Sequence, residues 1–383
     1  MRPRDNSMTF KSSDIHLVMF LSRATPLRRW DEMGILDREL AIYKTLAPNL
    51  AGISILTCGG IEELEYQSRI GDIKILYNRW GLTANFYSLL APFLHKTALQ
   101  NGTVYKTNQL DGSWTAINAG AIYRKPVIVR AGYLWAELNR QNGAQGPKAY
   151  LIDRLQNNFF SRAEALFVTT SSMKRQVIRD YNISPRKIKV VPNYVDTDIF
   201  RPMINVTPIE GRVCCVGRLH KIKNFESFIK ASTDIPEISL VFIGQGDQRS
   251  HLERIVRDCQ MSVKFLGALP HNKIPFELNR SSAFILPSLS EGHPKALIEA
   301  MSCGLPVIGT DIPGIRDVIQ HGETGLLCSH EPDSIRESIQ KIIDNPELAT
   351  RLGQNARHYV MNNFSIERIV EIELNAIREV TNS

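Results

Sequence analysis

Two glutamates with sugar-binding potential, Glu291 and Glu299, lie eight positions apart. The surrounding pattern predicts a buried strand at 283–286, a glycine-containing turn, a helix from Pro294 or Lys295 to Ser302, and a strand at 306–309. In parallel sheets ligands bind where a strand leads into a helix, and the helix N-terminus suits a phosphate. A carboxylate accepts two hydroxyl hydrogen bonds at once, which suits vicinal diols of ribose or hexose. The alternative is that Glu291 is a solvated loop acid and Glu299 a helix-surface acid.

A basic loop, Arg218 to Lys223, follows another predicted strand at 213–216. Fixed cations at such a position stabilise a departing diphosphate without a metal, and arginine can hold two phosphate oxygens. The alternative is a solvated basic loop. Gly244 and Gly246 form a weaker Gly-x-Gly signal, either a tight turn or part of the site. No metal is expected, because the nine histidines show no metal-binding spacing and Asp196-Thr197-Asp198 lies in a predicted linker.

The wider motif pattern resembles a known family. The Glu-x7-Glu spacing, the Ser290-Glu291-Gly292 turn, the run 300–308 and the segment 321–325 occur in the order typical of the retaining, nucleotide-sugar-dependent glycosyltransferases called glycosyl transferases group 1. That family includes sucrose and glycogen synthase relatives and bacterial polysaccharide enzymes. Many positions from about residue 190 to 383 match the family's motifs, and few positions before them do. It implies the GT-B fold, two doubly wound Rossmann-like α/β domains facing across a cleft.

The resemblance also implies residue roles. Glu291 would bind donor-sugar hydroxyls and Glu299 the ribose diol, while Arg218 and Lys223 would stabilise the diphosphate. In the family's basic element Asn224 stands where glycine is usual. The backbone around Leu266 and Gly267 would border the nucleobase, which leaves uracil and guanine undistinguished. The remaining donor-side positions implied are Gly217, Gly292, His293, Lys295 and Ala296.

The first half offers weaker acceptor-side candidates: Trp30, Asp111 and Arg130. Trp30 lies in a loop that replaces the family's glycine-rich one, and Asp111 lies in a polar turn after a strand. Arg130 stands near where many relatives have a histidine, so it could contact sugar or phosphate, or it could be structural. The missing histidine leaves the family's usual first-domain contact in question.

Alternating apolar strands and helices predict two parallel-sheet domains. We predict an acceptor-binding domain at 1–192, a linker at 193–211, a nucleotide-sugar-binding domain at 212–362, and a C-terminal helix at 363–383 that returns to the first domain. First-half helices are predicted at 39–46, 84–99, 114–121 and 150–160.

Composition limits the class of protein. The 383 residues are 43% hydrophobic, with no run long enough to span a membrane and no expected secretory signal. The six cysteines lack metal or CxxC spacing, which favours core thiols in the cytoplasm. The net charge of +7 comes without a nucleic-acid-binding motif. It indicates either a solvated basic surface or a peripheral contact with the inner membrane face. The basic N-terminal residues considered for that contact, beside Trp30, are Arg2, Arg4, Lys11, Arg23, Arg28 and Arg29.

These features favour a retaining, metal-independent hexosyltransferase that uses a UDP- or GDP-sugar and a carbohydrate or lipid-linked acceptor. No cofactor other than this co-substrate is expected. One alternative is a nucleotide-sugar 2-epimerase of the same architecture, which would need its own acid and base residues. Another is a non-catalytic nucleotide-binding scaffold, which would keep its partner binding when Glu291 is removed.

Overall fold

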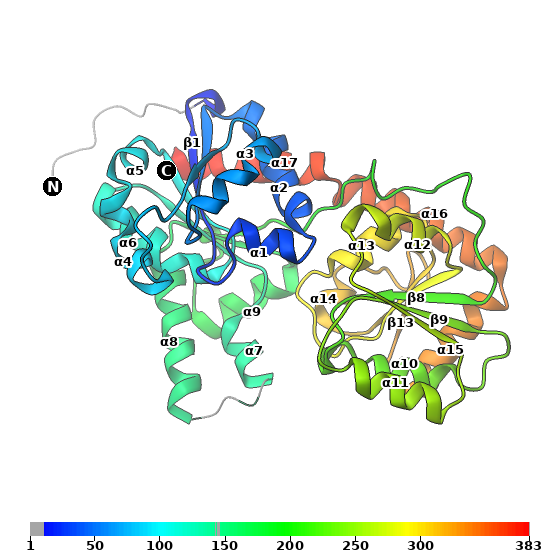
Figure 1. Cartoon of the computed structure of the whole chain (residues 1–383). Coiled ribbons are helices and arrows are strands. Elements are labelled where there is room, and N and C mark those ends of the chain that lie inside the picture. The colour runs from blue at the N-terminus through cyan, green and yellow to red at the C-terminus, as the bar shows by residue number, and fades with distance from the viewer. Residues whose placement is uncertain (1–10, 142, 144–145, 383) are drawn as a thin grey trace. The chain divides into compact units, whose positions relative to one another are not determined.

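A computed structural model describes residues 11–141, 143 and 146–382, and it consists of two compact units (Figure 1). Unit 1 comprises the described part of 1–191 together with 370–382, and unit 2 comprises 192–369. Each unit contains one wholly parallel sheet with helices, so the predicted α/β class is confirmed. Arg2 and Arg4 lie outside the described residues.

The seven-stranded sheet of unit 1 has the order β3-β2-β1-β4-β5-β6-β7. Its strands are mostly short buried apolar runs, as expected where helices cover both faces of a parallel sheet. The strands are β1 His16–Phe20, β2 Gly52–Leu56, β3 Lys74–Leu76, β4 Val104–Thr107, β5 Val127–Ala131, β6 Ala165–Val168 and β7 Ile188–Val190. The helices are α1 Leu27–Glu32, α2 Leu36–Leu46, α3 Gln67–Ile70, α4 Ala84–Leu94, α5 Lys96–Asn101, α6 Ser113–Tyr123, α7 Trp135–Gln141, α8 Gly146–Arg162 and α9 Ser171–Tyr181.

Glu63 supplies the N-terminal cap of α1, which begins after Pro26 without a cap from its own sequence. The buried Glu63 carboxylate accepts hydrogen bonds from the backbone N–H groups of Leu27 at 2.9 Å and Arg28 at 3.0 Å. It also accepts one from the Thr57 hydroxyl at 2.7 Å. A negative charge at a helix N-terminus is favourable, so Glu63 fixes the loop that leads out of β1.

The helix predicted at 84–99 is wrong as one element, because it consists of α4 and α5. His95 separates them with a non-helical backbone (φ −110, ψ 29). Within α4, Pro92 has no N–H to donate to the Ser88 carbonyl one turn earlier. That carbonyl accepts a 3.1 Å hydrogen bond from the Thr115 hydroxyl instead, which joins α4 to α6.

The six-stranded sheet of unit 2 has the order β10-β9-β8-β11-β12-β13. Two buried clusters pack on its faces, one with α13 and α16 and the other with α10, α11 and α15 (Figure 1). The strands are β8 Arg212–Val216, β9 Ser239–Ile243, β10 Val263–Gly267, β11 Ala283–Leu286, β12 Val307–Thr310 and β13 Leu326–Cys328. The helices are α10 Phe225–Ser232, α11 Arg249–Asp258, α12 Ile274–Asn279, α13 Lys295–Ser302, α14 Pro313–Arg316, α15 Pro332–Ile343, α16 Pro346–Asn363 and α17 Ile366–Thr381, whose residues from 370 onward belong to unit 1.

The segment predicted as a separate linker, 193–211, packs on unit 2. Phe200 is completely buried in the unit 2 core, and its carbonyl accepts a hydrogen bond from the Ser302 hydroxyl at 2.5 Å. Val195 donates its backbone N–H to the Phe364 carbonyl at 2.9 Å. The first division, at 191/192, lies within one residue of the predicted end of the first domain. These contacts explain why 193–211 belongs to unit 2 and why the second division, at 369/370, lies later in the chain than the predicted 362/363.

A buried ion pair joins α17 to the sheet of unit 1. The side chains of Lys106 on β4 and Glu373 on α17 are in contact, and each is only 1% exposed. The Lys106 ammonium also lies 5.0 Å from the centre of the Tyr43 ring on α2. Burial lowers the pKa of Lys106, and the Glu373 charge opposes that shift. Neighbouring residues of a strand point to opposite faces of the sheet. Tyr105 belongs to the apolar cluster on one face, so Lys106, together with α2 and α17, lies on the other face.

We expect Glu373→Ala to lower the free energy of unfolding by about 3–5 kcal/mol, because it leaves the buried Lys106 ammonium without a counter-charge. The double variant Lys106→Met/Glu373→Met should lose much less, because it removes both charges. Glu379, which pairs with Lys189 from the same helix but is 62% exposed, provides the matched control. Glu379→Ala should cost about 0–1 kcal/mol. Denaturant unfolding of the full chain measures all three, and equal losses for Glu373→Ala and Glu379→Ala would contradict the expectation.

Candidate functional site

The strand order of unit 2 reverses between β8 and β11. In open parallel sheets, ligands bind beyond the carboxyl ends of the strands at such a reversal. The loop after β8 carries Gly217 to Lys223, and the loop after β11 carries Ser288 to Glu291. A hydrogen bond from the Leu289 N–H to the Ile222 carbonyl, 2.8 Å long, joins these two loops. The fold therefore brings together residues from two predicted motifs that are far apart in the sequence.

The Glu291 carboxylate is held through one of its two oxygens. Oε1 accepts hydrogen bonds from the Lys223 ammonium at 2.5 Å and from the Ser288 hydroxyl at 2.7 Å. The Ser288 carbonyl accepts a 2.5 Å hydrogen bond from the Thr310 hydroxyl at the end of β12, which fixes the serine in turn. Within the described chain no hydrogen bond to Oε2 of Glu291 is found. The second oxygen can therefore accept a ligand hydroxyl without breaking this arrangement.

Lys223 and Arg218 differ in their surroundings. The Lys223 side chain extends back over Gly217, with its Cε 3.5 Å from where a Cβ on that glycine would lie. Arg218 is exposed, and its guanidinium makes no ion pair with any described residue. Asn224, where the family pattern has glycine, has a left-handed backbone (φ 52), which asparagine tolerates better than most residues.

Gly244 and Gly246 pack the loop after β9 against the loop after β8. A Cβ on Gly244, whose φ is +143, would lie 2.0 Å from the Gly217 carbonyl oxygen. A Cβ on Gly246 would lie 2.1 Å from the Leu219 carbonyl oxygen. The Gly-x-Gly signal thus has a packing role here. The Gly244 N–H donates to the Gly267 carbonyl at 2.7 Å, which adds the end of β10 to the same group of loops.

Glu299 on α13 is buried, with its side chain 3% exposed, so it is not the helix-surface acid of the alternative interpretation. Its Oε1 lies 3.0 Å from Nε2 of His271, a residue in the 3₁₀ turn after β10. The His271 ring contacts Phe200, with the ring centres 4.9 Å apart. His271 and Ser288 were missed in the sequence. His271 lies outside the motifs, and its partner Glu299 is 28 positions away. Ser288 is only three positions from Glu291, but it precedes the Ser290-Glu291-Gly292 turn that carried the motif.

Helix α13 begins at Lys295, directly after Pro294. His293 is buried: its ring lies edge-on to Phe364 at 4.9 Å, and its carbonyl accepts a 2.7 Å hydrogen bond from the Asn193 side chain. The Lys295 ammonium lies 5.8 Å from the centre of the Tyr194 ring. These contacts fix the start of α13. The ligand contacts implied for Gly292, His293, Lys295, Ala296 and Leu266 stay predictions.

The cysteines near this sheet are unsuited to nucleophilic chemistry. Burial raises the pKa of Cys214 to about 11 and raises the pKa of Cys215 well above its usual value. Burial also raises the pKa of Cys303, with Glu299 adding to the effect. Thiols with raised pKa values stay protonated and unreactive. All six cysteines are free thiols. Among the described residues, no group of three His, Cys, Asp or Glu side chains is placed to hold a metal ion.

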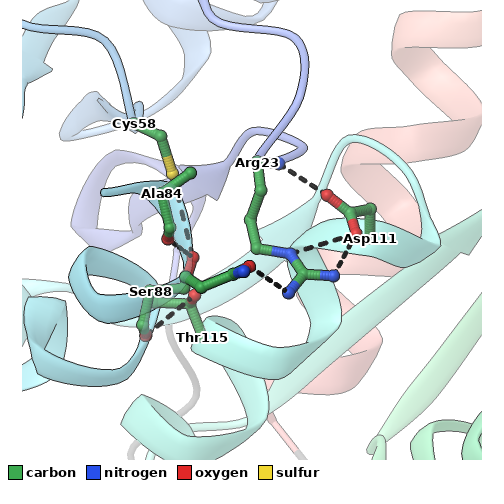
Figure 2. A network of polar contacts seen from close by, with 7 residues as sticks. Arg23, Cys58, Ala84, Ser88, Asp111 and Thr115 are labelled. Carbon is green, nitrogen blue, oxygen red and sulfur yellow. Dashed lines mark hydrogen bonds and ion pairs between the residues drawn. The ribbon is translucent and has the colours of Figure 1, made fainter.

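The sheet of unit 1 has its own reversal, between β1 and β4, and a polar network lies there (Figure 2). The Arg23 guanidinium, after β1, bonds to Oδ1 of Asp111, after β4, at 2.7 Å, and the Arg23 backbone N–H donates to Oδ2 at 2.6 Å. Arg23 also donates to the Asn85 side chain at 3.1 Å. Both oxygens of Asp111 are thus engaged. A second branch links Cys58 to Ser88, with Sγ and Oγ 3.8 Å apart.

Two of the acceptor-side candidates, Trp30 and Arg130, are buried within unit 1. Trp30 is only 3% exposed, because it packs beneath α1 in the unit 1 core, so its assignment to the acceptor and to a membrane surface is corrected. Its basic neighbours Arg28 and Arg29 both pair with Glu32. Arg130 on β5 is buried and donates to the Val191 carbonyl at 3.3 Å, which favours the structural interpretation of this residue.

Each half of the chain matches a different known family model. Residues 53–199 match the family described as Glycosyltransferase Family 4, and residues 200–359 match Glycosyl transferases group 1. A UDP-Gal:alpha-D-GlcNAc-diphosphoundecaprenol alpha-1,3-galactosyltransferase of Escherichia coli is 30% identical over 52% of this chain and 56% of its own length. An uncharacterized glycosyltransferase of Haemophilus influenzae is 31% identical over 44% of this chain and 50% of its own length. The chain thus spans about half the length of these curated relatives.

Solved structures share the fold of the whole chain. HepE of Anabaena, in complex with UDP and glucose, matches with a TM-score of 0.78 at 16% identity, covering 95% of this chain and 100% of that one. Sucrose-phosphate synthase of Thermosynechococcus elongatus matches with a TM-score of 0.75 at 18% identity, covering 96% and 99%. The GT-B fold expected from the sequence is therefore confirmed.

The contact between His271 and Glu299 generates a prediction about nucleotide affinity. If Glu299 binds a ribose diol, His271→Ala should weaken binding of a ribonucleoside diphosphate about tenfold, because Glu299 loses a hydrogen bond that orients it. Affinity for the 2′-deoxy nucleotide should change less. His251→Ala is the matched control, since His251 also contacts a glutamate but is 45% exposed. Calorimetric titration measures both affinities, and equal weakening of ribo and 2′-deoxy nucleotides would contradict the role given to Glu299.

Proposed function

Because this chain belongs to the glycosyl transferases group 1, we propose that it is a retaining, metal-independent glycosyltransferase. It transfers a hexose from a UDP- or GDP-sugar to a hydroxyl of a carbohydrate or lipid-linked acceptor. The observation that carries this proposal is the arrangement at the carboxyl ends of β8 and β11. There Lys223 and Ser288 hold one oxygen of Glu291, and Arg218 is exposed on the neighbouring loop.

The proposed mechanism uses fixed charges. As the bond between sugar and diphosphate breaks, negative charge grows on the leaving group, and Arg218 and Lys223 stabilise it. Arg218 can hold two phosphate oxygens, while Lys223 acts as a point charge beside Glu291. Oε2 of Glu291 accepts donor-sugar hydroxyls, and Glu299 accepts those of the ribose. The acceptor hydroxyl oxygen bonds to the anomeric carbon on the same face from which the diphosphate departs, and the departing phosphate takes the hydroxyl proton. The anomeric configuration is therefore retained.

The acceptor class is supported by the Escherichia coli relative, which is named for transfer to a diphosphoundecaprenol-linked sugar. The N-acetyl-alpha-D-glucosaminyl L-malate synthase of Bacillus anthracis, 26% identical over 49% of this chain, is named for a small hydroxy acid instead. We propose a role in polysaccharide or glycolipid synthesis, in the cytoplasm at the inner membrane face.

Nucleotide binding provides the first test. In a thermal-shift panel of UDP, GDP and ADP, we expect one nucleotide to stabilise the protein selectively, with the shift unchanged by EDTA. A ligand at 100 times its dissociation constant adds about 2.7 kcal/mol, which is readily detected. A shift that EDTA abolishes would contradict metal independence, and no shift with any nucleotide would contradict the donor site itself.

Removal of Glu291 provides the test of chemistry. Glu291→Ala should reduce turnover about 100-fold or more, because the donor sugar loses its carboxylate partner and Lys223 loses the contact that positions it. Nucleoside diphosphate release measures turnover, and NMR of the product should show retained anomeric configuration. Glu337→Ala, at an exposed acid on α15, is the matched control. Unchanged turnover in Glu291→Ala, or an inverted product, would contradict the proposal.

A further inference from the structure

Helix α4 in unit 1 exposes an apolar face to solvent. Four large side chains, spaced by three, one and three residues, lie on this face: Phe86, Leu89, Leu90 and Phe93, with exposed fractions of 65%, 60%, 39% and 64%. The buried face carries Tyr87, Ser88, Ala91 and Pro92. The helix has no charged residue. Most surface helices turn their polar residues outward, so a solvent face with four large Phe and Leu side chains and a single exposed polar one, Asn85, indicates a surface that another apolar layer covers.

The buried face holds this helix firmly in place. Ser88 accepts a hydrogen bond from Thr115 of α6, and the Pro92 carbonyl accepts one from the Tyr123 hydroxyl of α6 at 2.7 Å. The Tyr87 hydroxyl lies 2.7 Å from Nε2 of His95. The apolar residues therefore stand on a helix that is fixed at both ends against its neighbour, beside α6 in Figure 1, and their exposure does not come from a frayed segment.

The stretch of sequence between the acids Asp72 and Glu137, which includes α4, carries mostly positive charges. Between residues 73 and 136 the chain has seven Lys or Arg residues and a single acid, Asp111, which pairs with Arg23. Lys106 and Arg130 are buried, which leaves five cations at or near the surface: Lys74, Arg79, Lys96, Arg124 and Lys125.

Several of these cations lie at the C-terminal end of α4. The Arg79 guanidinium lies 4.5 Å from the ring centre of the half-exposed Trp80, which contacts the His95 ring. Burial, with help from Arg79 and Lys74, lowers the pKa of His95 to about 4, so this ring is neutral and the positive charge comes from lysine and arginine. Lys96 follows His95, and Arg124 follows Tyr123, whose hydroxyl reaches α4.

We propose that the α4 face, defined as Phe86, Leu89, Leu90 and Phe93 with the cations at its C-terminal end, docks on the surface of an anionic phospholipid bilayer. Phe, Leu and Trp side chains beside lysine and arginine are the composition of helices that lie in the membrane interface. A patch with cations but almost no acids around it is complementary to lipid phosphates. Among the described residues, no helix is both long and apolar enough to span a membrane, so the contact is peripheral.

This inference rests on the proposed function only for its purpose, which is to bring the enzyme to a lipid-linked acceptor. The geometry itself lies within unit 1 and does not use the donor site. It also replaces the membrane contact expected near Trp30, where the aromatic ring is buried and the adjacent arginines share an ion pair with Glu32.

Vesicle sedimentation tests the proposal with the full chain and no nucleotide. We expect the protein to sediment with vesicles of equal parts phosphatidylcholine and phosphatidylglycerol, and much less with pure phosphatidylcholine. The double variant Phe86→Ser/Phe93→Ser should bind the mixed vesicles at least about tenfold more weakly, because two rings no longer enter the interface. Ile61→Ser is the matched control, since Ile61 is also in unit 1 and 70% exposed but lies beside acids.

The charged part of the surface is tested separately. Arg79→Gln and Lys96→Gln should each weaken binding about fivefold, as expected for about 1 kcal/mol per cation near an anionic surface. The loss should shrink at high salt. Arg254→Gln and Arg257→Gln, at exposed positions on α11 of unit 2, are the matched controls and should bind like the unchanged protein.

Three results would overturn the inference. They are no binding of the unchanged protein to mixed vesicles, equal binding by Phe86→Ser/Phe93→Ser, and a dimer of the unchanged protein in analytical ultracentrifugation that this double variant abolishes. The last result would assign the face to a second copy of the chain. Thermal shifts with nucleotides, measured on the same variants, separate this test from that of the proposed function. A variant that loses vesicle binding and keeps its nucleotide shift supports the inference, whereas a protein that binds vesicles but no nucleotide contradicts only the donor site.

Discussion

The Glu291 carboxylate lies at the point on which the donor-side arrangement depends. Its Oε1 joins Lys223, from the loop after β8, to Ser288, from the loop after β11, and Thr310 fixes the serine from β12. One oxygen atom thus couples the loops after β8 and β11, and Ser288 couples them to the end of β12. The arrangement constrains Lys223 as well, because its charge is already shared with a carboxylate. In the proposed donor complex, a diphosphate would therefore receive only part of the attraction of Lys223, and the exposed Arg218 would be the stronger anion contact.

The two sheets place cation and carboxylate pairs at equivalent points, where their strand order reverses, but the pairs differ in what remains open. In unit 1, Arg23 and Asp111 form a closed pair, because both carboxylate oxygens bond to Arg23. In unit 2, Lys223 and Ser288 engage the same oxygen of Glu291, and Oε2 stays available to a ligand. The same topology thus gives a structural network in one unit and a candidate binding site in the other.

The strands predicted at 213–216, 283–286 and 306–309 correspond to β8, β11 and β12, because buried apolar runs bounded by turns have few other structures available to them. The sequence also located the residues around Glu291, since they belong to motifs with fixed spacing. It did not locate His271 or Glu63, because each acts through a partner whose proximity depends on tertiary packing. It also missed Ser288, which lies three residues before Glu291 but outside the turn that carried the motif. Trp30 was misassigned for a related reason: an aromatic residue beside two arginines is compatible with an interface, and only the packing of α1 shows that it is core.

Helix α4 shows most clearly why side-chain burial cannot be derived from hydrophobicity alone. A hydrophobic pattern would turn Phe86, Leu89, Leu90 and Phe93 inward, since they form the more apolar face of the helix. The structure buries the opposite face, because the Ser88 carbonyl left open by Pro92 and the Pro92 carbonyl itself accept hydrogen bonds from Thr115 and Tyr123 of α6. Once these polar groups are satisfied inside, the apolar face remains outside, and the cations beside it are what give that face a lipid partner.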